Sequence, residues 1–153
     1  MTDTVDNPGP DTLKDIFTTS LKLLEEGDVE KWVALFAPDA VFEFVYAPPG
    51  FPTVIRGTEA LRAQIGIMPQ QLGVEFGEPV FHTATPDGLV VAEFTGDCTV
   101  RATGGRYRQD YISVVRFENG LITHFRDYWN PWLLMAAAGG ETAWNEAVRA
   151  LAG

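Results

Sequence analysis

The spacing of apolar residues in the first part of the chain predicts two helices that lead into a strand. Asp11 can cap the first helix and Gly27 can end it. The apolar side chains of this helix recur at helical spacing and are Leu13, Ile16, Phe17, Leu21 and Leu24. Asp28 can cap a second helix, which Pro38 stops, and the AVFEFVY that follows has the β-branched and aromatic content of a strand.

The rest of the pattern predicts one more helix, a run of strands and a helical end. The turn-rich APPGFP leads into a helix from Thr58 to Met68, with Thr58 as the expected cap. Strands follow in VEFGEPVFHTA, GLVVAEFTGDCTV, RYRQDYISVVRF and LITHFRDYW, separated by the turn sequences PDG, TGG and ENG. Asn130 can cap a last helix that begins at Pro131, and a further helix is expected from Thr142 to Leu151. This order predicts an α+β fold with a curved antiparallel sheet.

The turn sequence ENG leaves two registers open for the last pair of strands. A two-residue turn would place Asp127 across from Ile112. A three-residue loop, with Gly120 in the left-handed conformation, would place Asp127 across from Tyr111. The second register gathers the charged side chains on one face, as a sheet with one buried face requires. We therefore predict the three-residue loop, with Asp127 on the inner face.

The inner face assigned in this way is aromatic with a few polar groups, which is typical of a small-molecule pocket. Burial of Asp127 against Phe125 and Trp129 would raise its pKa toward neutrality, as acid–base catalysis requires. The alternative is that hydroxyl groups hold this carboxylate for a structural purpose. We expect Asp127 and Tyr111 to be catalytic. The side chains expected to contact a ligand are Phe42, Phe44, Tyr46, Phe94, Cys98, Gln109, Ser113, Trp129 and Trp132.

The outer face of the same strands predicts a homodimer. The chosen register turns Leu121 and Thr123 inward and Ile122 outward. Apolar residues are then interspersed with charges on the outer face; they are Ile112, Val114, Ile122 and Tyr128. Glu43 and His124 are also expected on this face, away from the pocket.

Composition and charge exclude several classes of function. The formal charge is −10 and no run of Lys or Arg offers a footprint for phosphates, so nucleic acid is not an expected partner. One cysteine, Cys98, excludes an internal disulfide framework and fits a cytoplasmic protein. No apolar run approaches the roughly 20 residues of a membrane span. We expect a short disordered leader over residues 1–10 and a single domain over 11–153.

Neither a metal nor an organic cofactor is expected. Two histidines, His82 and His124, exclude a His-rich metal centre built by one subunit. The chain also has no GxGxxG loop for a nucleotide.

Three stretches resemble the SnoaL-like branch of the nuclear transport factor two-like superfamily. They are LFAPDAVFEF, the APPGFP loop before IRGTEALRAQI, and RFENGLITHFRDYWNP. Members of the superfamily include ketosteroid isomerase, limonene epoxide hydrolase, polyketide cyclases and phenazine-biosynthesis isomerases. The resemblance covers Leu13 to Met135. It implies a cone-shaped α+β barrel, in which a mixed, mostly antiparallel sheet wraps around helices and an internal cavity, and commonly a homodimer through the outer sheet face.

The resemblance carries one catalytic residue over to this chain. The acid that protonates the epoxide in limonene epoxide hydrolase falls on Asp127, as does the acid or base of the phenazine-type proteins and the cyclases. The Arg and the second Asp of the epoxide hydrolase fall on Phe94 and Gly96, and its water-holding polar pair falls on Phe42 and Phe44. The base of ketosteroid isomerase aligns near Phe44. Asp127 is thus the only catalytic residue that the resemblance supplies.

These observations predict a cofactor-free enzyme. Its expected reaction is isomerisation, cyclisation or hydrolysis of a hydrophobic, oxygenated small molecule, such as a polyketide, terpenoid, steroid or phenazine precursor. The alternative is a non-catalytic, dimeric accessory module that binds a small molecule, which the missing isomerase and hydrolase residues favour.

Overall fold

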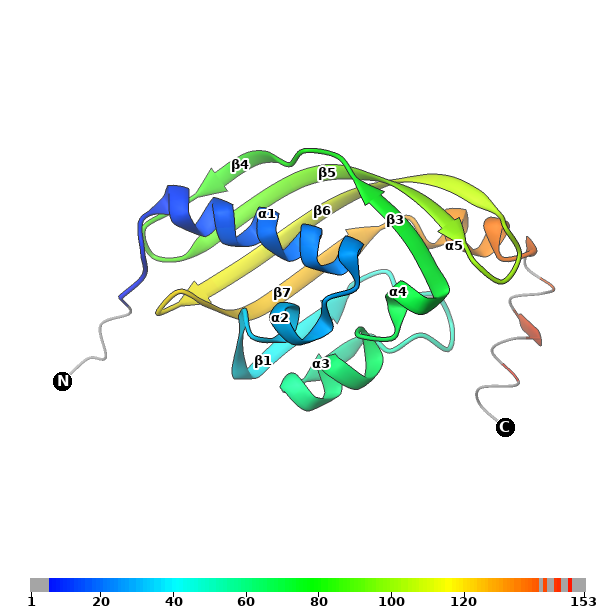
Figure 1. Cartoon of the computed structure of the whole chain (residues 1–153), viewed down its shortest axis with the longest axis horizontal. Helices are drawn as coiled ribbons and strands as arrows, with labels where there is room; N and C mark the ends of the chain where they lie inside the picture. Colours follow the sequence, from blue (N-terminus) through cyan, green and yellow to red (C-terminus); the bar gives the residue numbers. More distant parts are fainter. Residues whose placement is uncertain (1–5, 141, 143–144, 147–148, 150–153) are drawn as a thin grey trace.

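A computed structural model describes residues 6–140, 142, 145–146 and 149, and it has the predicted α+β fold. A curved sheet wraps around α1, α2 packs against α1, and α3 packs against α2 and β1 (Figure 1). In chain order the elements are α1 (Pro10–Glu26), α2 (Val29–Val33), β1 (Phe36–Phe44), β2 (Val54–Arg56), α3 (Thr58–Gln64), α4 (Met68–Gln71), β3 (Leu72–Phe76), β4 (Val80–Ala84), β5 (Leu89–Val100), β6 (Arg106–Glu118), β7 (Leu121–Trp129) and α5 (Pro131–Ala137). The helix predicted from Thr142 to Leu151 falls mostly outside the described residues.

The sheet is mixed and mostly antiparallel, as expected. Its strand order is β2-β1-β7-β6-β5-β3, and β4 also pairs with β5. Only β1 and β7 run parallel among these pairs. The predicted strand VEFGEPVFHTA is in fact two strands, β3 and β4, which pair with successive parts of β5. Pro79 lies between them and has no N–H for a ladder hydrogen bond.

Three of the predicted helix ends are confirmed. Gly27 closes α1 in the left-handed conformation, with φ 75°. The carboxylate of Asp28 caps α2 by accepting a hydrogen bond from the backbone N–H of Lys31 at 3.3 Å. The side chain of Asn130 caps α5 by accepting one from the backbone N–H of Trp132 at 3.0 Å.

The other predicted caps are wrong by one or two residues. Gly9 is the cap of α1 and Gly57 is the cap of α3, and neither provides a side-chain hydrogen bond. Asp11 and Thr58 lie instead in the first turns of these helices. The negative charge of Asp11 there complements the positive end of the helix dipole.

The residues before α1 are held against the turn between β6 and β7. The side-chain amide of Asn7 donates to the carbonyl oxygen of Phe117 at 2.9 Å, and its oxygen accepts from the N–H of Gly120 at 3.0 Å. The described part of the expected leader, residues 6–10, is therefore bound to the sheet or already within α1.

The turn between β6 and β7 contains two residues and not the predicted three. Asn119 (φ 53°) and Gly120 (φ 78°) both lie in the left-handed region, as a type I′ turn requires. A bulge follows on β7, because Phe117 pairs with Ile122 but Arg116 already pairs with His124. Thr123 is the extra residue in this bulge.

The bulge changes the register that we predicted but preserves the predicted face of Asp127. Asp127 pairs with Ser113, and not with Tyr111 or Ile112. It therefore shares the inner face with Ser113. Before the bulge the prediction is wrong, because Ile122 points inward and is fully buried whereas Leu121 is 37% exposed.

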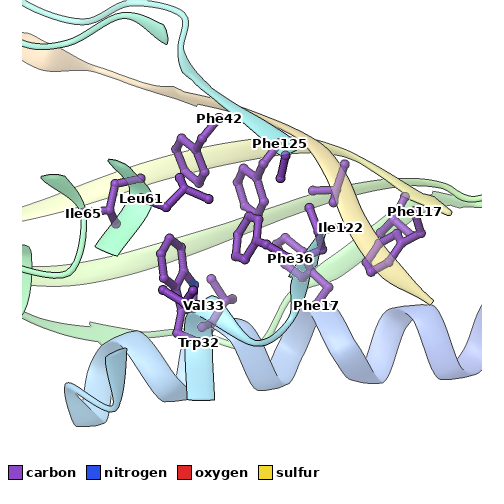
Figure 2. Packing of buried hydrophobic residues seen from close by; sticks show 14 of the residues in the cluster. Phe17, Trp32, Val33, Phe36, Phe42, Leu61, Ile65, Phe117, Ile122 and Phe125 are labelled. Atoms are coloured by element: carbon purple, nitrogen blue, oxygen red, sulfur yellow. The ribbon is translucent and has the colours of Figure 1, made fainter. Parts of the chain in front are cut away.

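A core of aromatic and aliphatic side chains fills part of the concave face of the sheet (Figure 2). The stacked rings of Phe42 and Phe125, with centroids 4.6 Å apart, join β1 to β7. Figure 2 shows side chains from three helices and three strands meeting here: Phe17, Trp32, Val33, Phe36, Phe42, Leu61, Ile65, Phe117, Ile122 and Phe125. This packing fixes the sheet on which the candidate site is built.

Candidate functional site

A pocket of about 240 Å³ lies between the sheet and the helices that cover its concave face. The second half of α1 contributes Ser20, Leu21 and Leu24 to its wall, and α5 contributes Leu134. The sheet contributes aromatic rings from β1, β3, β5, β6 and β7, namely Phe42, Phe44, Phe76, Phe94, Tyr107, Tyr111, Phe125 and Trp129. Most of this lining is apolar, so the pocket is suited to a hydrophobic ligand.

Asp127 is the carboxylate of this pocket. Its neighbours on the inner face of the sheet are Phe44 on β1 and Ser113 on β6. Phe125 and Trp129 lie two residues before and after it on the same face of β7. Three aromatic rings and one hydroxyl group therefore surround the side chain.

These surroundings change the acidity of Asp127. Burial raises the pKa of its carboxyl group from an ordinary 3.8 to about 7. The Ser113 hydroxyl donates a hydrogen bond to Oδ1 at 3.1 Å, which lowers the pKa and so opposes this effect only in part. Near neutral pH the group exists in both protonation states.

Two tyrosines bring hydroxyl groups to the pocket. Tyr111 stacks on Phe94, with ring centroids 4.9 Å apart, and its hydroxyl lies 3.6 Å from the thiol of Cys98. Tyr107 pairs with Cys98 across β5 and β6 and also shares a hydrogen bond with the thiol. Burial is the main cause of a raised pKa in all three groups, so they stay protonated at neutral pH.

Gln109 connects the pocket to the end of β7. Its side-chain N–H donates to the carbonyl oxygen of Asn130 at 2.8 Å, and its side-chain oxygen accepts from the N–H of Asn130 at 3.0 Å. The amide therefore fixes the junction between β7 and α5. Gln109 lines the pocket, but these two backbone bonds use much of its hydrogen-bonding capacity.

Most of the predicted site residues meet at this pocket, and four do not line it. Those that line it are Asp127, Tyr111, Phe42, Phe44, Phe94, Gln109 and Trp129. Ser113 and Cys98 are buried behind the lining, against Asp127 and Tyr111. Trp132 lies in the first turn of α5 and is 57% exposed.

The placement of Tyr46 corrects the prediction. Strand β1 ends at Phe44, so the inward alternation stops before residue 46 is reached. Tyr46 is 61% exposed and its ring packs against Tyr128, whose centroid is 5.7 Å away. Glu43 and His124 lie on the outer face as expected, where Glu43 accepts a hydrogen bond from Arg126 at 2.9 Å.

Sequence reasoning missed the helical wall of the pocket and Tyr107. One signal was present, because Ser20 is a polar residue within the apolar stripe of α1. Its hydroxyl donates to the carbonyl oxygen of Phe17 at 2.6 Å, which satisfies it within the helix. For the other helical residues, Met68 among them, the sequence carried no signal that they would cover this part of the sheet.

The described lining of the pocket provides both acid–base and hydrogen-bonding groups. Asp127, Tyr107 and Tyr111 are the ionisable groups among the residues that line the pocket. Within the described ranges, no group of three or more His, Cys, Asp or Glu side chains is placed to hold a metal ion. Over the same residues, no helix is long and apolar enough to cross a membrane, which is a separate finding from the chemistry of the pocket. Asp127 can transfer a proton, and the two tyrosines can donate hydrogen bonds.

Comparisons with known proteins place this chain among similar sequences. The model of the SnoaL-like domain family matches residues 17–125. An uncharacterised PhzA/B-like protein from Pseudomonas aeruginosa is 45% identical over 131 residues, which cover 85% of this chain and 92% of the relative.

Solved structures share the fold. The crystal structure of a "putative isomerase" from Bacillus subtilis superposes with a TM-score of 0.81 at 36% identity, covering 86% of this chain and 95% of that one. A "putative polyketide cyclase" from Xanthomonas campestris, at 16% identity, superposes with a TM-score of 0.73 over 84% of this chain and 98% of its own. At that identity the second likeness shows the fold alone.

Proposed function

Because this chain belongs to the SnoaL-like domain family, we propose that it is a cofactor-free enzyme in which Asp127 transfers a proton. The substrate is a hydrophobic, oxygenated small molecule that fits the aromatic pocket. The reaction is an isomerisation, a cyclisation or a hydrolysis. The similar structure from Bacillus subtilis, described as a "putative isomerase", supports a reaction of this range.

The observation that carries the proposal is a carboxyl group with a pKa of about 7 on the wall of an apolar pocket. A general acid or base is most effective when its pKa lies near the working pH, because both protonation states are then available. Strongly raised acid pKa values are concentrated at functional sites. A carboxylate held only for structure would not need to face the pocket.

The neighbours of Asp127 have defined roles in this proposal. Ser113 holds Oδ1 through its hydrogen bond, so Oδ2 is the oxygen that faces the substrate proton. The rings of Phe44 and Trp129 exclude water from one side of the carboxylate. Tyr111, which is neutral, donates a hydrogen bond to a substrate oxygen.

A test that does not require the natural substrate is hydrogen exchange into apolar ketones. We expect the protein to speed the incorporation of deuterium next to the carbonyl group of a bound ketone such as 2-tetralone in D₂O, measured by mass spectrometry. Asp127→Asn should reduce this rate by about 10²- to 10⁴-fold, the usual contribution of general acid–base catalysis. Asp110→Asn is the matched control, since Asp110 is exposed on β6 and does not line this pocket.

A second candidate is a non-catalytic module that binds a small molecule. The specific observation in its favour is that the lining contributed by the described residues contains no Lys, Arg, His or second carboxylate beside Asp127. This candidate predicts that ketones bind without exchange above the rate in buffer.

We also propose that the protein is a cytoplasmic homodimer that associates through the outer face of its sheet. Tyr46, at 61% exposed, and Ile112, at 43%, are apolar or aromatic side chains on this surface, and Tyr128 lies beside Tyr46. Ile122 is removed from the predicted dimer surface because it is in the core.

A further inference from the structure

The hydroxyl groups of Tyr107 and Tyr111 share an unusual partner. Both tyrosines line the pocket, and within the described part of the chain the hydrogen-bond partner of each hydroxyl is the thiol of Cys98. The thiol is itself placed to donate to the carbonyl oxygen of Gly96 at 3.7 Å, which leaves only its lone pairs for the tyrosines. Sulfur is a weak acceptor. A ligand oxygen would therefore accept hydrogen bonds from these two half-buried phenols better than the thiol does.

The fold holds this arrangement in place. Cys98 and Tyr107 are directly paired across β5 and β6, and Tyr111 leans along β6 toward them over Gly96. A Cβ atom at position 96 would lie 2.9 Å from Cε2 of Tyr111 and 3.1 Å from Cγ2 of Val74. The absence of a side chain at Gly96 is thus what lets the Tyr111 ring lie flat on the strand. Stacking on Phe94 fixes the plane of that ring.

The hydroxyl pair is separated from the carboxylate along the sheet. Asp127 is level with Ser113 on β6, and Cys98 is level with Tyr107, six residues before Ser113. The Tyr111 hydroxyl lies between these two levels, where it contacts the Cys98 thiol and where, besides burial, Asp127 also raises the pKa of Tyr111. Apolar residues line the interval, among them Phe94 and Val74. One ligand can reach both polar positions only if an apolar body separates its polar groups.

We propose that Tyr107 and Tyr111 form a second polar subsite, which binds a carbonyl or ether oxygen at the end of the ligand remote from Asp127. The inference deepens the proposed function, on which it rests for the use of the pocket, by defining the ligand as an apolar body with an acceptor oxygen at its far end. Because burial raises the pKa of both phenols, they donate hydrogen bonds and carry no charge. Since the described residues bring no cation to the lining of the pocket, a neutral oxygen fits better than a carboxylate.

Two probes of the same shape test the subsite. 2-Acetylnaphthalene carries an acceptor oxygen, and 2-ethylnaphthalene does not. Their affinities are measured by equilibrium dialysis at pH 8.5, where Asp127, with its pKa of about 7, is ionised and has no proton to donate to a ketone. We expect wild-type protein to bind the ketone about 3- to 10-fold more tightly than the hydrocarbon for each hydrogen bond that the tyrosines supply.

Variants of the two tyrosines show which hydroxyl group causes the preference for the ketone. Tyr111→Phe and Tyr107→Phe should each lower the affinity for the ketone by about 3- to 10-fold. The double variant should bind both probes equally, while its unchanged affinity for the hydrocarbon shows that the pocket is intact. Tyr128→Phe is the matched control, since Tyr128 lies on the outer face against Tyr46 and should change neither affinity. Equal affinities of the wild-type protein for the two probes, or an unchanged ratio in the double variant, would overturn the subsite.

This experiment is independent of turnover. Loss of deuterium exchange in Asp127→Asn with an unchanged ketone preference supports both the enzyme and the subsite. A ketone preference without any exchange supports the subsite and contradicts the enzyme. Exchange that depends on Asp127, with no tyrosine-dependent preference, supports the enzyme and contradicts the subsite.

Discussion

Replacing Asp127 by Asn should stabilise the protein at neutral pH and remove part of the pH dependence of its stability. Burial raises the pKa of this carboxyl group from 3.8 to about 7 in the folded chain. Above pH 3.8 the unfolded chain loses the proton while the folded chain keeps it, so rising pH favours unfolding. The loss of folding free energy caused by the buried Asp127 carboxyl group therefore grows between about pH 4 and pH 7 and is constant at higher pH. Below pH 4 it is absent, because both states are protonated.

The magnitude follows from the size of the pKa difference. Each pKa unit corresponds to about 1.36 kcal/mol. The change from 3.8 to about 7 therefore lowers the free energy of unfolding by about 4 kcal/mol above pH 7. Between pH 5 and pH 8 the change is about 2 to 3 kcal/mol, since the rest occurs below pH 5. Asn has nearly the same shape, carries no charge at any pH and accepts the Ser113 hydrogen bond through its amide oxygen.

Urea unfolding of both proteins at pH 5, 6, 7 and 8 measures this difference. The free energy of unfolding of Asp127→Asn minus that of the wild type cancels the titration of every other group. We expect this difference to rise by about 2 to 3 kcal/mol from pH 5 to pH 8 and then to level off. A difference for Asp127→Asn that does not change over this pH range would refute the buried, proton-retaining carboxyl group.

Three further predictions test the fold around the site. Gly96→Ala should lower the free energy of unfolding by about 1 to 3 kcal/mol, because its Cβ would meet the Tyr111 ring at 2.9 Å. Urea unfolding measures this loss of stability. If no stability is lost, the Tyr111 ring moves freely. Ile122→Ala should cost about 2 to 5 kcal/mol in the same assay and Leu121→Ala less than about 1 kcal/mol, whereas the reverse order would contradict the bulge. Ile112→Asp should convert the proposed dimer to a monomer in sedimentation experiments, and a monomeric wild type at micromolar concentration would contradict that interface.

Local signals were sufficient for the strands that carry most of the sheet. The boundaries of β7 coincide with the predicted LITHFRDYW, and β5 and β6 agree with their predictions to within one residue. These strands are long, alternate between apolar and polar residues and end in turn sequences. The helical wall of the pocket could not be predicted in the same way. Which face of α1 covers which strand depends on packing between segments far apart in the chain, and periodicity shows only that one face is apolar.

The inward direction of Asp127 was predicted from an incorrect turn, and the reason it was still correct is physical. Asn119 and Gly120 favour a type I′ turn of two residues, which by itself would place Asp127 on the outer face. The distribution of charge demands the opposite face after Arg116, because His124 and Arg126 would otherwise pair with Val115 and Ser113 and point into the core. An extra residue at Thr123 satisfies both requirements, since it lets the turn keep its local geometry and reverses the alternation beyond it. Burial over the whole strand therefore determined the face of the carboxylate, whereas the turn alone determined the register of the first residues.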